Sequence, residues 1–190
     1  MQVLRAAGHR RMPWRNGGGV TTEIAVFPEA AGLDDFEWRL SMASVASDGP
    51  FSSFAGIDRT LAVLEGEGIV LSVEGQAEAR MTPASRPVAF AADQPASVRL
   101  IAGPVTDLNA MTRRGLWTHS MERLAVRGSS AIAGSGGLTI VFCAAGSSTI
   151  SDGKETLTLS RQDAAIVDAV RVDAKSGPAE LCIVRFDPII

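Results

Sequence analysis

The sequence predicts an all-β protein, and three features of the chain support this prediction. Short runs with apolar residues at every second position recur along its length, which is the pattern of half-buried strands. Glycine, proline, aspartate or serine separates each run from the next, as expected of turns. Segments with helical spacing are short and weak. Many short strands at regular spacing are typical of a β-sandwich or barrel.

The expected strands follow one another from residue 20 onward. In 20–26 (VTTEIAV) alternate residues share a face, namely Val20, Thr22, Ile24 and Val26. In 36–45 (FEWRLSMASV) the apolar face is formed by Phe36, Trp38, Leu40 and Met42. Segment 60–73 places Glu-Gly-Glu-Gly between two apolar runs, so we expect a hairpin there. The later runs are PVAFAA (87–92), SVRLIAG (97–103), LTIVFCAAG (138–146), ETLTLS (155–160), DAAIVDAV (163–170) and ELCIVRF (180–186).

The two halves of the chain show a faint internal repeat. Both run through a strand, a glycine turn, a strand, a turn with aspartate, a strand and a final apolar strand. Segment 111–128 has mixed character and is expected to link the halves. With 190 residues, one domain or two small fused ones can form. We therefore expect two related β-barrels, over 1–112 and 113–190, packed as one compact unit.

Composition excludes several classes of partner. The net charge is −3, with 18 Lys+Arg against 21 Asp+Glu, so we expect neither nucleic acid nor an anionic membrane surface as partner. No apolar stretch approaches the roughly 20 residues that span a bilayer. The first residues are basic but no apolar run follows them, so no secretory signal is expected. Cys143 and Cys182 lie in apolar runs, which suits buried reduced thiols and a cytoplasmic location.

The chain contains few histidines and lacks tyrosine, which limits the chemistry available to it. The chain has 2 histidines, His9 and His119, far apart, and contains no Cys-x-x-Cys motif. This makes a conventional zinc or iron site unexpected, and we predict neither a metal nor a cofactor. With 0 tyrosines, no tyrosine can act as acid or base.

The segment PWRNGGGVTTE (13–23) allows three interpretations. A phosphate loop would need a lysine after the glycines and a helix to follow, and neither is present. A flexible hinge is a second interpretation, because glycine tolerates positive φ. The third is a pocket edge, in which a tight glycine turn presents Arg15 and Asn16.

Three arginines are candidates for binding a carboxylate, because guanidinium offers a planar fork that matches two carboxylate oxygens. They are Arg15, Arg39 and Arg59. Arg39 points away from the apolar face of its strand, so the alternative is a solvated strand face. Arg59 begins a strand, where it would point to a barrel mouth, and its alternative is a surface pair with Asp58.

Other polar residues have weaker signals. Ser41 shares the face of Arg39 and is a candidate ligand contact, as is Thr22. Glu23 is a candidate acid or base, or a partner of an arginine, and a solvated strand position is the alternative. Asp107 and Asn109 share a face and are expected to close the first barrel by bonding turn backbone.

Three segments together resemble the HutD/Ves family, over about residues 11–115. They are PWRNGGGVTTEIAVFP (13–28), FEWRLSMASVASDGPFSSFAGIDRTLAVLEGEGIVL (36–71) and GPVTDLNAMTRRG (103–115). The resemblance implies a bicupin fold and a small carboxylate ligand from histidine breakdown, such as urocanate or a formylated glutamate. It also implies a link to histidine utilisation in the HutD branch and to stress response in the Ves branch. Metal cupins carry histidines after the first glycine turn, and segments 68–80 and 88–100 contain none.

We therefore expect a metal-free bicupin that binds a small carboxylate metabolite and regulates histidine utilisation, with a homodimer as one possible assembly. One alternative is a metal-independent enzyme that acts on an intermediate of histidine degradation, with Glu23 as base and Arg59 as anchor. Another is a stress-related protein without catalysis, which a first barrel filled by packed side chains would favour.

Overall fold

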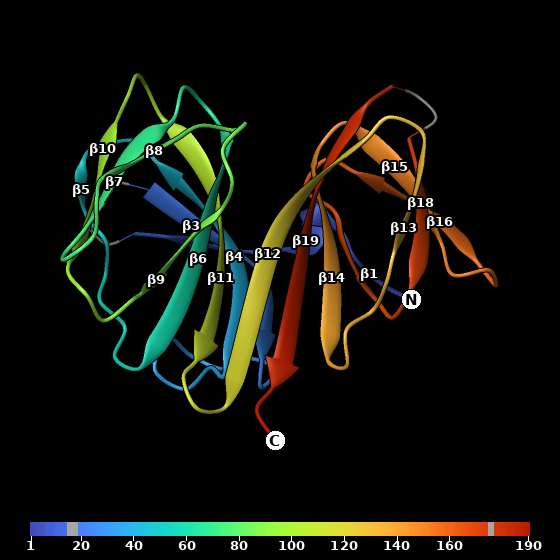
Figure 1. The fold of residues 1–190 in the computed structure, drawn as a ribbon, viewed down its shortest axis with the longest axis horizontal. Helices are drawn as coiled ribbons and strands as arrows, with labels where there is room; N and C mark the ends of the chain where they lie inside the picture. Colours follow the sequence, from blue (N-terminus) through green and yellow to red (C-terminus); the bar gives the residue numbers. More distant parts are fainter. Residues whose placement is uncertain (15–18, 175–176) are drawn as a thin grey trace. The chain divides into compact units, whose positions relative to one another are not determined.

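The computed structural model describes residues 1–14, 19–174 and 177–190, and antiparallel strands dominate these ranges (Figure 1). Helical structure within them is limited to η1, a 3-10 turn at Ala6–Gly8. The all-β prediction is confirmed. The chain divides into two compact units, which we describe separately. The first unit is Arg10–Thr118 with Ile189, and the second is Met1–His9 and His119–Pro188 with Ile190.

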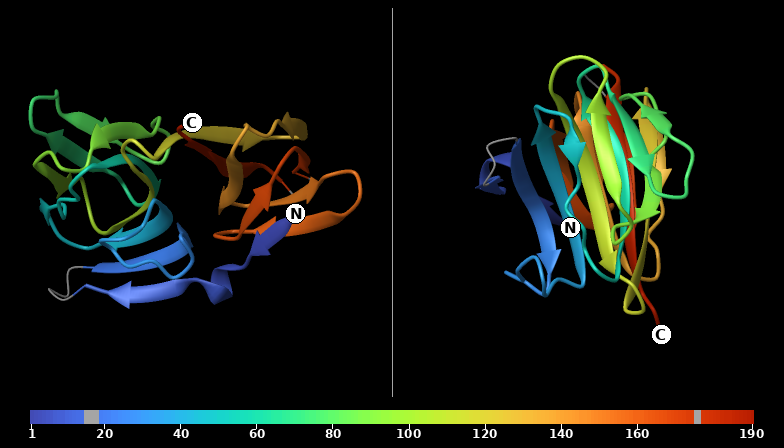
Figure 2. Two further views of the ribbon diagram at one scale, coloured as in Figure 1. Left: turned by 90° about the horizontal axis from the view of Figure 1, so that it is seen from below. Right: turned by 90° about the vertical axis from the view of Figure 1, so that its left-hand side faces the viewer.

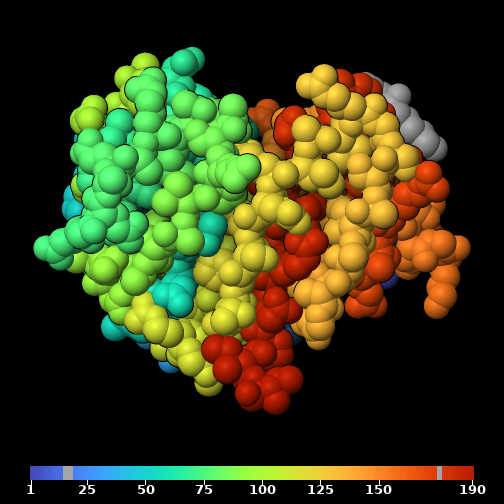
Figure 3. Space-filling view, viewed as in Figure 1, coloured from blue at the N-terminus to red at the C-terminus, as the bar shows by residue number. Residues whose placement is uncertain are grey.

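The first unit, in its described residues, is made of two antiparallel sheets that form separate layers (Figure 2). The larger sheet has the order β2-β3-β4-β11-β6-β9, and the smaller has the order β5-β10-β7-β8. Green residues of the smaller sheet and its turns form the face of this unit seen in Figure 3. The strand bounds are β2 Arg10–Pro13, β3 Gly19–Phe27, β4 Trp38–Val45, β5 Gly49–Pro50, β6 Ile57–Glu65, β7 Ile69–Val73, β8 Ala79–Met81, β9 Val88–Ala91, β10 Ala96–Leu100 and β11 Val105–Arg113.

A β-bulge in β3 changes which of its residues face the interior. Glu23 pairs with Ser41 of β4 and Ala25 pairs with Leu40, so Ile24 is the extra residue. Because a bulge shifts the alternation by one position, the single face expected for residues 20–26 does not extend past Glu23. Val26, beyond the bulge, lies opposite Arg39.

Among the described residues of the first unit, two apolar clusters contribute to the core. The larger includes Leu61, Leu71 and Val98, which come from both sheets. The smaller is formed by Phe36, Ile57, Ala92 and Met111. Burial of apolar area stabilises each by about 25 cal/mol per Å².

The turn after β6 does not form the hairpin that its glycines predict. β6 pairs with β11 and β9 in the larger sheet, whereas β7 pairs with β10 and β8 in the smaller one. The turn therefore carries the chain from one sheet to the other. Gly68 has a φ of 112°, and a Cβ at this position would collide with the carbonyl oxygen of Met81.

The second unit also consists, in its described residues, of two antiparallel sheets, ordered β1-β17-β14-β19-β12 and β13-β18-β15-β16. Its interior is an apolar cluster that includes Val141, Cys143, Ile150 and Leu181. The bounds are β1 Gln2–Leu4, β12 Trp117–Val126, β13 Ser129–Ile132, β14 Leu138–Ala145, β15 Ser147–Ser151, β16 Thr156–Ser160, β17 Ala164–Val167, β18 Val170–Asp173 and β19 Ala179–Pro188.

The units differ from the predicted division at residue 112. Residues 1–9 belong to the second unit because β1 pairs with β17 along Gln2–Leu4. Segment 111–128, expected as a link of mixed character, contains the ten-residue strand β12. Exposed Thr118, Ser120 and Glu122 alternate there with partly buried residues, so its pattern is that of a strand with one wet face.

The two cysteines are buried, and neither is in a disulfide. Burial raises the pKa of Cys143 and of Cys182 to about 11, so both thiols stay protonated at neutral pH. Over the described part of the chain, helices with the length and apolar character needed to cross a membrane are absent.

The turn between the sheets leads to a prediction about stability. Gly68→Ala adds a Cβ against the Met81 backbone at a positive φ, and we expect it to lower the free energy of unfolding by about 3 kcal/mol. The matched control is Gly75→Ala, where φ is 76° but nothing lies within 4 Å of the added Cβ. It should lower the free energy of unfolding by only about 1 kcal/mol, because alanine is less stable than glycine in the left-handed conformation. Urea unfolding measures both, and equal losses would contradict the contact with Met81.

Candidate functional site

A cavity of about 600 Å³ lies inside the first unit, a size typical of small-molecule sites. Its wall draws residues from both core clusters, such as Ala43 from the larger and Met111 from the smaller. The wall is formed by Met12, Pro13, Trp14, Thr21, Leu33, Arg39, Ser41, Ala43, Pro50, Phe51, Ser52, Phe54, Arg59, Asn109 and Met111.

A row of buried polar side chains runs from β11 to β6, and two of its members, Arg59 and Asn109, line the cavity. Arg59 donates from Nε to Asn109 Oδ1 at 2.9 Å and from Nη2 to the same oxygen at 2.5 Å. Asn109 in turn donates from Nδ2 to Asp107 Oδ1 at 2.6 Å. All three residues are buried, with 7% or less of each exposed. Asn109 thus connects a guanidinium with a carboxylate and fixes the direction of its own amide.

Two aromatic rings also contact the Arg59 guanidinium. Its Cζ lies 4.2 Å from the centre of the Phe51 ring and 5.6 Å from that of Phe90, which are cation–π distances. Burial lowers the pKa of Arg59 to about 10, the Asp107 charge opposes this change, and the Arg39 charge adds to it. Arg59 therefore remains a cation at neutral pH.

Arg39 is the second buried guanidinium of the wall. Its Nε donates to Glu23 Oε2 at 2.8 Å, and the two side chains are 5% and 11% exposed. Its Nη2 is buried and has no hydrogen-bond partner in the described residues. An unmet buried donor costs about 1–3 kcal/mol, and more when it is charged. Such a donor in a cavity wall is a site for an acceptor from outside the chain.

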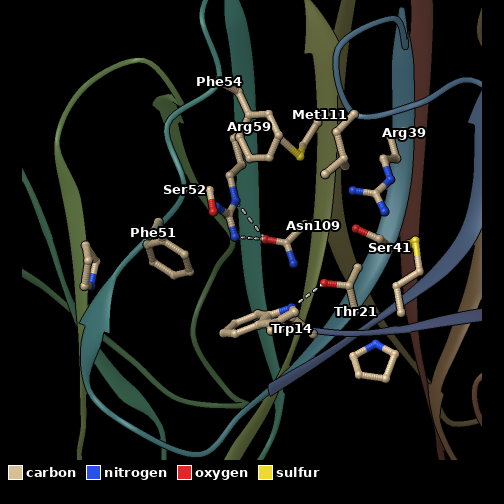
Figure 4. Close-up of a pocket in the computed structure, with 15 residues that line it drawn as sticks. Trp14, Thr21, Arg39, Ser41, Phe51, Ser52, Phe54, Arg59, Asn109 and Met111 are labelled. Carbon is tan, nitrogen blue, oxygen red and sulfur yellow. Dashed lines mark hydrogen bonds between the residues drawn. The ribbon is translucent and has the colours of Figure 1, made fainter. Parts of the chain in front are cut away.

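The two arginines flank a polar centre (Figure 4). Asn109 on β11 pairs with Ser41 on β4 and with Leu61 on β6. In the view, the Asn109 amide lies between the two guanidinium groups and the Ser41 side chain lies below that of Arg39. Below them in the view, Trp14 donates from Nε1 to Thr21 Oγ1 at 2.7 Å. The remaining wall is largely apolar. The site thus offers two cations, several hydroxyl and amide groups, and an apolar surface.

The structure brings several predicted residues together. Arg39, Arg59 and Ser41 all line the cavity. The solvated strand face considered for Arg39 is wrong, because only 4% of the residue is exposed. The surface pair considered for Arg59 with Asp58 is also wrong, since Asp58 instead pairs with Arg114 at 2.8 Å.

Other predicted residues lie elsewhere. Thr21, rather than Thr22, lines the cavity, because Thr22 pairs with Met42 on the opposite face of β3. Glu23 is the partner of Arg39, and its proposed role as acid or base stays a prediction. Arg15 and Asn16 lie outside the described residues.

Sequence reasoning assigned Asp107 and Asn109 to the wrong task. They were expected to bond turn backbone, whereas they form the buried row that reaches Arg59. The available signal was the alternation of Asp107, Asn109 and Met111, which predicts one common face. Phe51 and Ser52 lie in the segment between β5 and β6, and no periodicity marks them.

The described residues contain no group of three or more His, Cys, Asp or Glu side chains placed to hold a metal ion. The charged groups of the cavity are instead paired or bonded within the wall, as Arg39 is with Glu23. What the arrangement can do chemically is bind an anion.

Comparison with known proteins places the chain in a family. The model of the HutD family matches residues 6–182. The chain is 36% identical over 170 residues to Protein Ves of Citrobacter koseri, covering 81% of this chain and 86% of that one. It is 43% identical over 109 residues to an uncharacterized 21.2 kDa protein in the hutC 3′ region of Pseudomonas putida. That match covers 57% of this chain and 56% of the relative, or about half of each.

Solved structures agree with this placement. A conserved protein of unknown function from Pseudomonas aeruginosa PAO1 matches with a TM-score of 0.90 and 34% identity over 98% of both chains. HutD from Pseudomonas fluorescens SBW25, solved in a formate condition, matches with a TM-score of 0.83 and 31% identity, over 100% of this chain and 99% of that one. A cupin 2 conserved barrel domain protein from Leptotrichia buccalis, at 10% identity and a TM-score of 0.60 over 94% and 96%, shares the fold.

The two-sheet units and these neighbours define the class of the protein as all-β with a cupin-like fold. Within that class, the chain belongs to the HutD family, in which the proteins named HutD and Ves are among its relatives.

The buried pair in the cavity wall leads to a prediction. Glu23→Ala leaves the Arg39 guanidinium without its carboxylate, and we expect a loss on the order of 3 kcal/mol in the free energy of unfolding. In Glu23→Ala/Arg39→Met neither charge remains, so at least half of that loss should be recovered. Urea unfolding of the single and double variants gives the coupling between the two residues.

The matched control is Glu122→Ala, which breaks a pair at 2.6 Å with Arg185 whose carboxylate is 60% exposed. Its loss should be much smaller, because water replaces the partner. If the Glu23 and Arg39 substitutions simply added, the two charges would not depend on each other.

Proposed function

We propose that the chain binds a small carboxylate metabolite in the cavity of the first unit and thereby regulates histidine utilisation. The observation that carries the proposal is the Arg39 guanidinium, which is 4% exposed and has a buried Nη2 without a partner in the described residues. A charged donor kept in that state lowers stability. Binding of an anion would supply the acceptor that Arg39 Nη2 lacks, which would account for this buried donor.

The chemistry of the wall favours a carboxylate. Guanidinium groups match the two oxygens of a carboxylate in one plane, and Arg59 is already fixed by Asn109. Ser41 lies beside Arg39 (Figure 4) and has a hydroxyl that can donate to the same anion. Hydrogen bonds to a charged group contribute on the order of 1.5–3 kcal/mol each.

The physiological part of the proposal rests on the relatives. One is named for the hutC 3′ region of Pseudomonas putida, and a structural neighbour is HutD of Pseudomonas fluorescens. Urocanate and formylated glutamate are intermediates of histidine breakdown that carry carboxylates, and both suit a site with two arginines. The cavity of about 600 Å³ also argues against a first barrel filled by packed side chains, which would have favoured the stress-protein alternative.

The two arginines lead to a binding prediction. Arg39→Gln keeps a polar side chain near Glu23 but removes the charge that faces the anion. Arg59→Gln does the same beside Asn109. We expect each to weaken binding of urocanate or formylglutamate by at least tenfold, which corresponds to about 1.4 kcal/mol. Isothermal titration calorimetry at low salt measures the affinities.

Arg99→Gln is the matched control, because Arg99 lies on β10 of the same unit and is exposed. It should bind as the unaltered chain does. Saturable binding that is equal in all four proteins would place the ligand elsewhere. Absence of binding by the unaltered chain to urocanate, formiminoglutamate and formylglutamate would remove the proposed ligand class.

A further inference from the structure

The charges around the cavity can be counted from their contacts. Arg39 is matched by Glu23 at 2.8 Å. Arg59 has no carboxylate within ion-pair distance among the described residues; its acceptor is the neutral Asn109 amide. Asp107 lies one hydrogen bond further on, behind Asn109. The net charge of these four ionisable groups is therefore zero when Asp107 is ionised and +1 when it is protonated.

Asp107 is held where its protonation can change. The residue is 1% exposed, and it accepts hydrogen bonds from the Asn109 side chain and from the Ala43 backbone. Burial raises the pKa of its carboxyl to about 6, while the charge of Arg59 and the two hydrogen bonds oppose this rise. At neutral pH the group is within reach of its titration range.

Among the nearby charges, that of Arg59 has the main effect on the protonation of Asp107. The charged side chains on the neighbouring strands that belong to the cavity region are Arg59 on β6, Arg39 on β4 and Glu23 on β3, the last two paired with each other. β6 also carries Asp58, which pairs with Arg114, and Glu65, which lies opposite Thr106 at the end of the strand. From the smaller sheet, the residues of the core that pack toward this region are apolar, namely Ile69, Leu71, Val73, Met81 and Val98. A negative charge placed against Arg59 therefore acts on Asp107 with little competition.

We propose that the cavity takes a singly charged carboxylate, and that Asp107 takes up one proton from the solvent when this anion binds. The inference rests on the proposed function and narrows its two candidate ligands to urocanate, which carries one carboxylate, because formylglutamate carries two. With Asp107 protonated, the four groups carry one net positive charge, which one carboxylate balances. A second carboxylate would lie unbalanced against the apolar wall formed by Trp14, Phe51 and Phe54, which instead suits a flat apolar body.

The direction of the pH dependence follows from this coupling. In the free protein Asp107 titrates near 6, and a bound anion offsets Arg59 and raises the pKa of Asp107 further. The bound state therefore holds more protons than the free state between these two values. Affinity is then highest below pH 6, falls by up to tenfold per pH unit above it, and becomes constant once Asp107 is ionised in both states.

The test is calorimetric titration of the full chain with cinnamate, a flat carboxylate with no other group that titrates between pH 5 and pH 8. Two buffers that differ in their enthalpy of ionisation give the number of protons taken up. We expect uptake approaching one proton near pH 7 and a tenfold or greater loss of affinity from pH 6 to pH 8. Binding without proton uptake overturns the inference and leaves the proposed function standing.

Asp107→Asn assigns the proton. The substituted amide still offers Asn109 an oxygen but cannot ionise, so its affinity should be independent of pH and at least tenfold tighter than that of the unaltered chain at pH 8. Glu67→Gln, at an exposed turn position, removes one negative charge from the same unit and should keep the original pH profile. A pH slope retained in Asp107→Asn overturns the inference. If that variant does not fold, the proton count of the unaltered chain decides.

Two further probes test the charge of the ligand. The compounds 4-carboxycinnamate and 4-carbamoylcinnamate have nearly the same shape and differ by one negative charge. We expect the dicarboxylate to bind at least tenfold more weakly, and equal or tighter binding of it contradicts the singly charged site. Failure of every carboxylate to bind at any pH between 5 and 8 would instead refute the proposed function itself.

Discussion

A guanidinium group that leaves water must be met by acceptors or by an opposite charge. The first unit provides this at Arg59 and for Nε of Arg39, but not for Nη2 of Arg39 within the described residues. The Glu23 carboxylate accepts a hydrogen bond from Arg39, and the Asn109 amide oxygen accepts one from Arg59. These partners come from β3 and β11, strands that flank or adjoin those of the arginines in one sheet. The strand order of the larger sheet is thus what keeps two cations in its interior.

The second unit has the same arrangement of two sheets, but none of its described arginines is buried. One apolar cluster of its described residues draws members from both of its sheets, as a sandwich core ordinarily does. In the first unit the cavity has wall residues from two apolar clusters and also carries the buried polar residues Arg59 and Asn109. Part of the packing energy that a filled core would provide is absent from this unit, which is the usual relation between a binding site and stability.

The strands could be predicted from the sequence, because apolar residues recur at every second position in most of them. Which face of each strand points into the protein could not be predicted. The rule that polar residues face water failed at Arg39, since both faces of β4 are buried. Alternation in β3 is interrupted at Ile24, and one sequence does not show where a bulge falls. The glycines after Glu65 predicted a turn correctly, yet sheet membership depends on β9, β10 and β11, which lie far along the chain. Arg59 was identified from the chemistry of its side chain, whereas Asn109 acquires its role only through a neighbour 50 positions away.

The bulge at Ile24 has a consequence for how this protein can change over evolutionary time. Glu23 lies opposite Ser41 and Val26 lies opposite Arg39, so the two residues share one face of β3 although they are three positions apart. Loss of the codon for Ile24 would restore a regular strand and keep these pairs. Loss of a codon between Gly19 and Glu23, with the bulge closed, would instead place Ile24 opposite Ser41 and turn Glu23 to the other face, so that Arg39 would lose the carboxylate with which it pairs. The spacing between Gly19 and Glu23 therefore decides whether a carboxylate faces Arg39, whatever side chains lie between them.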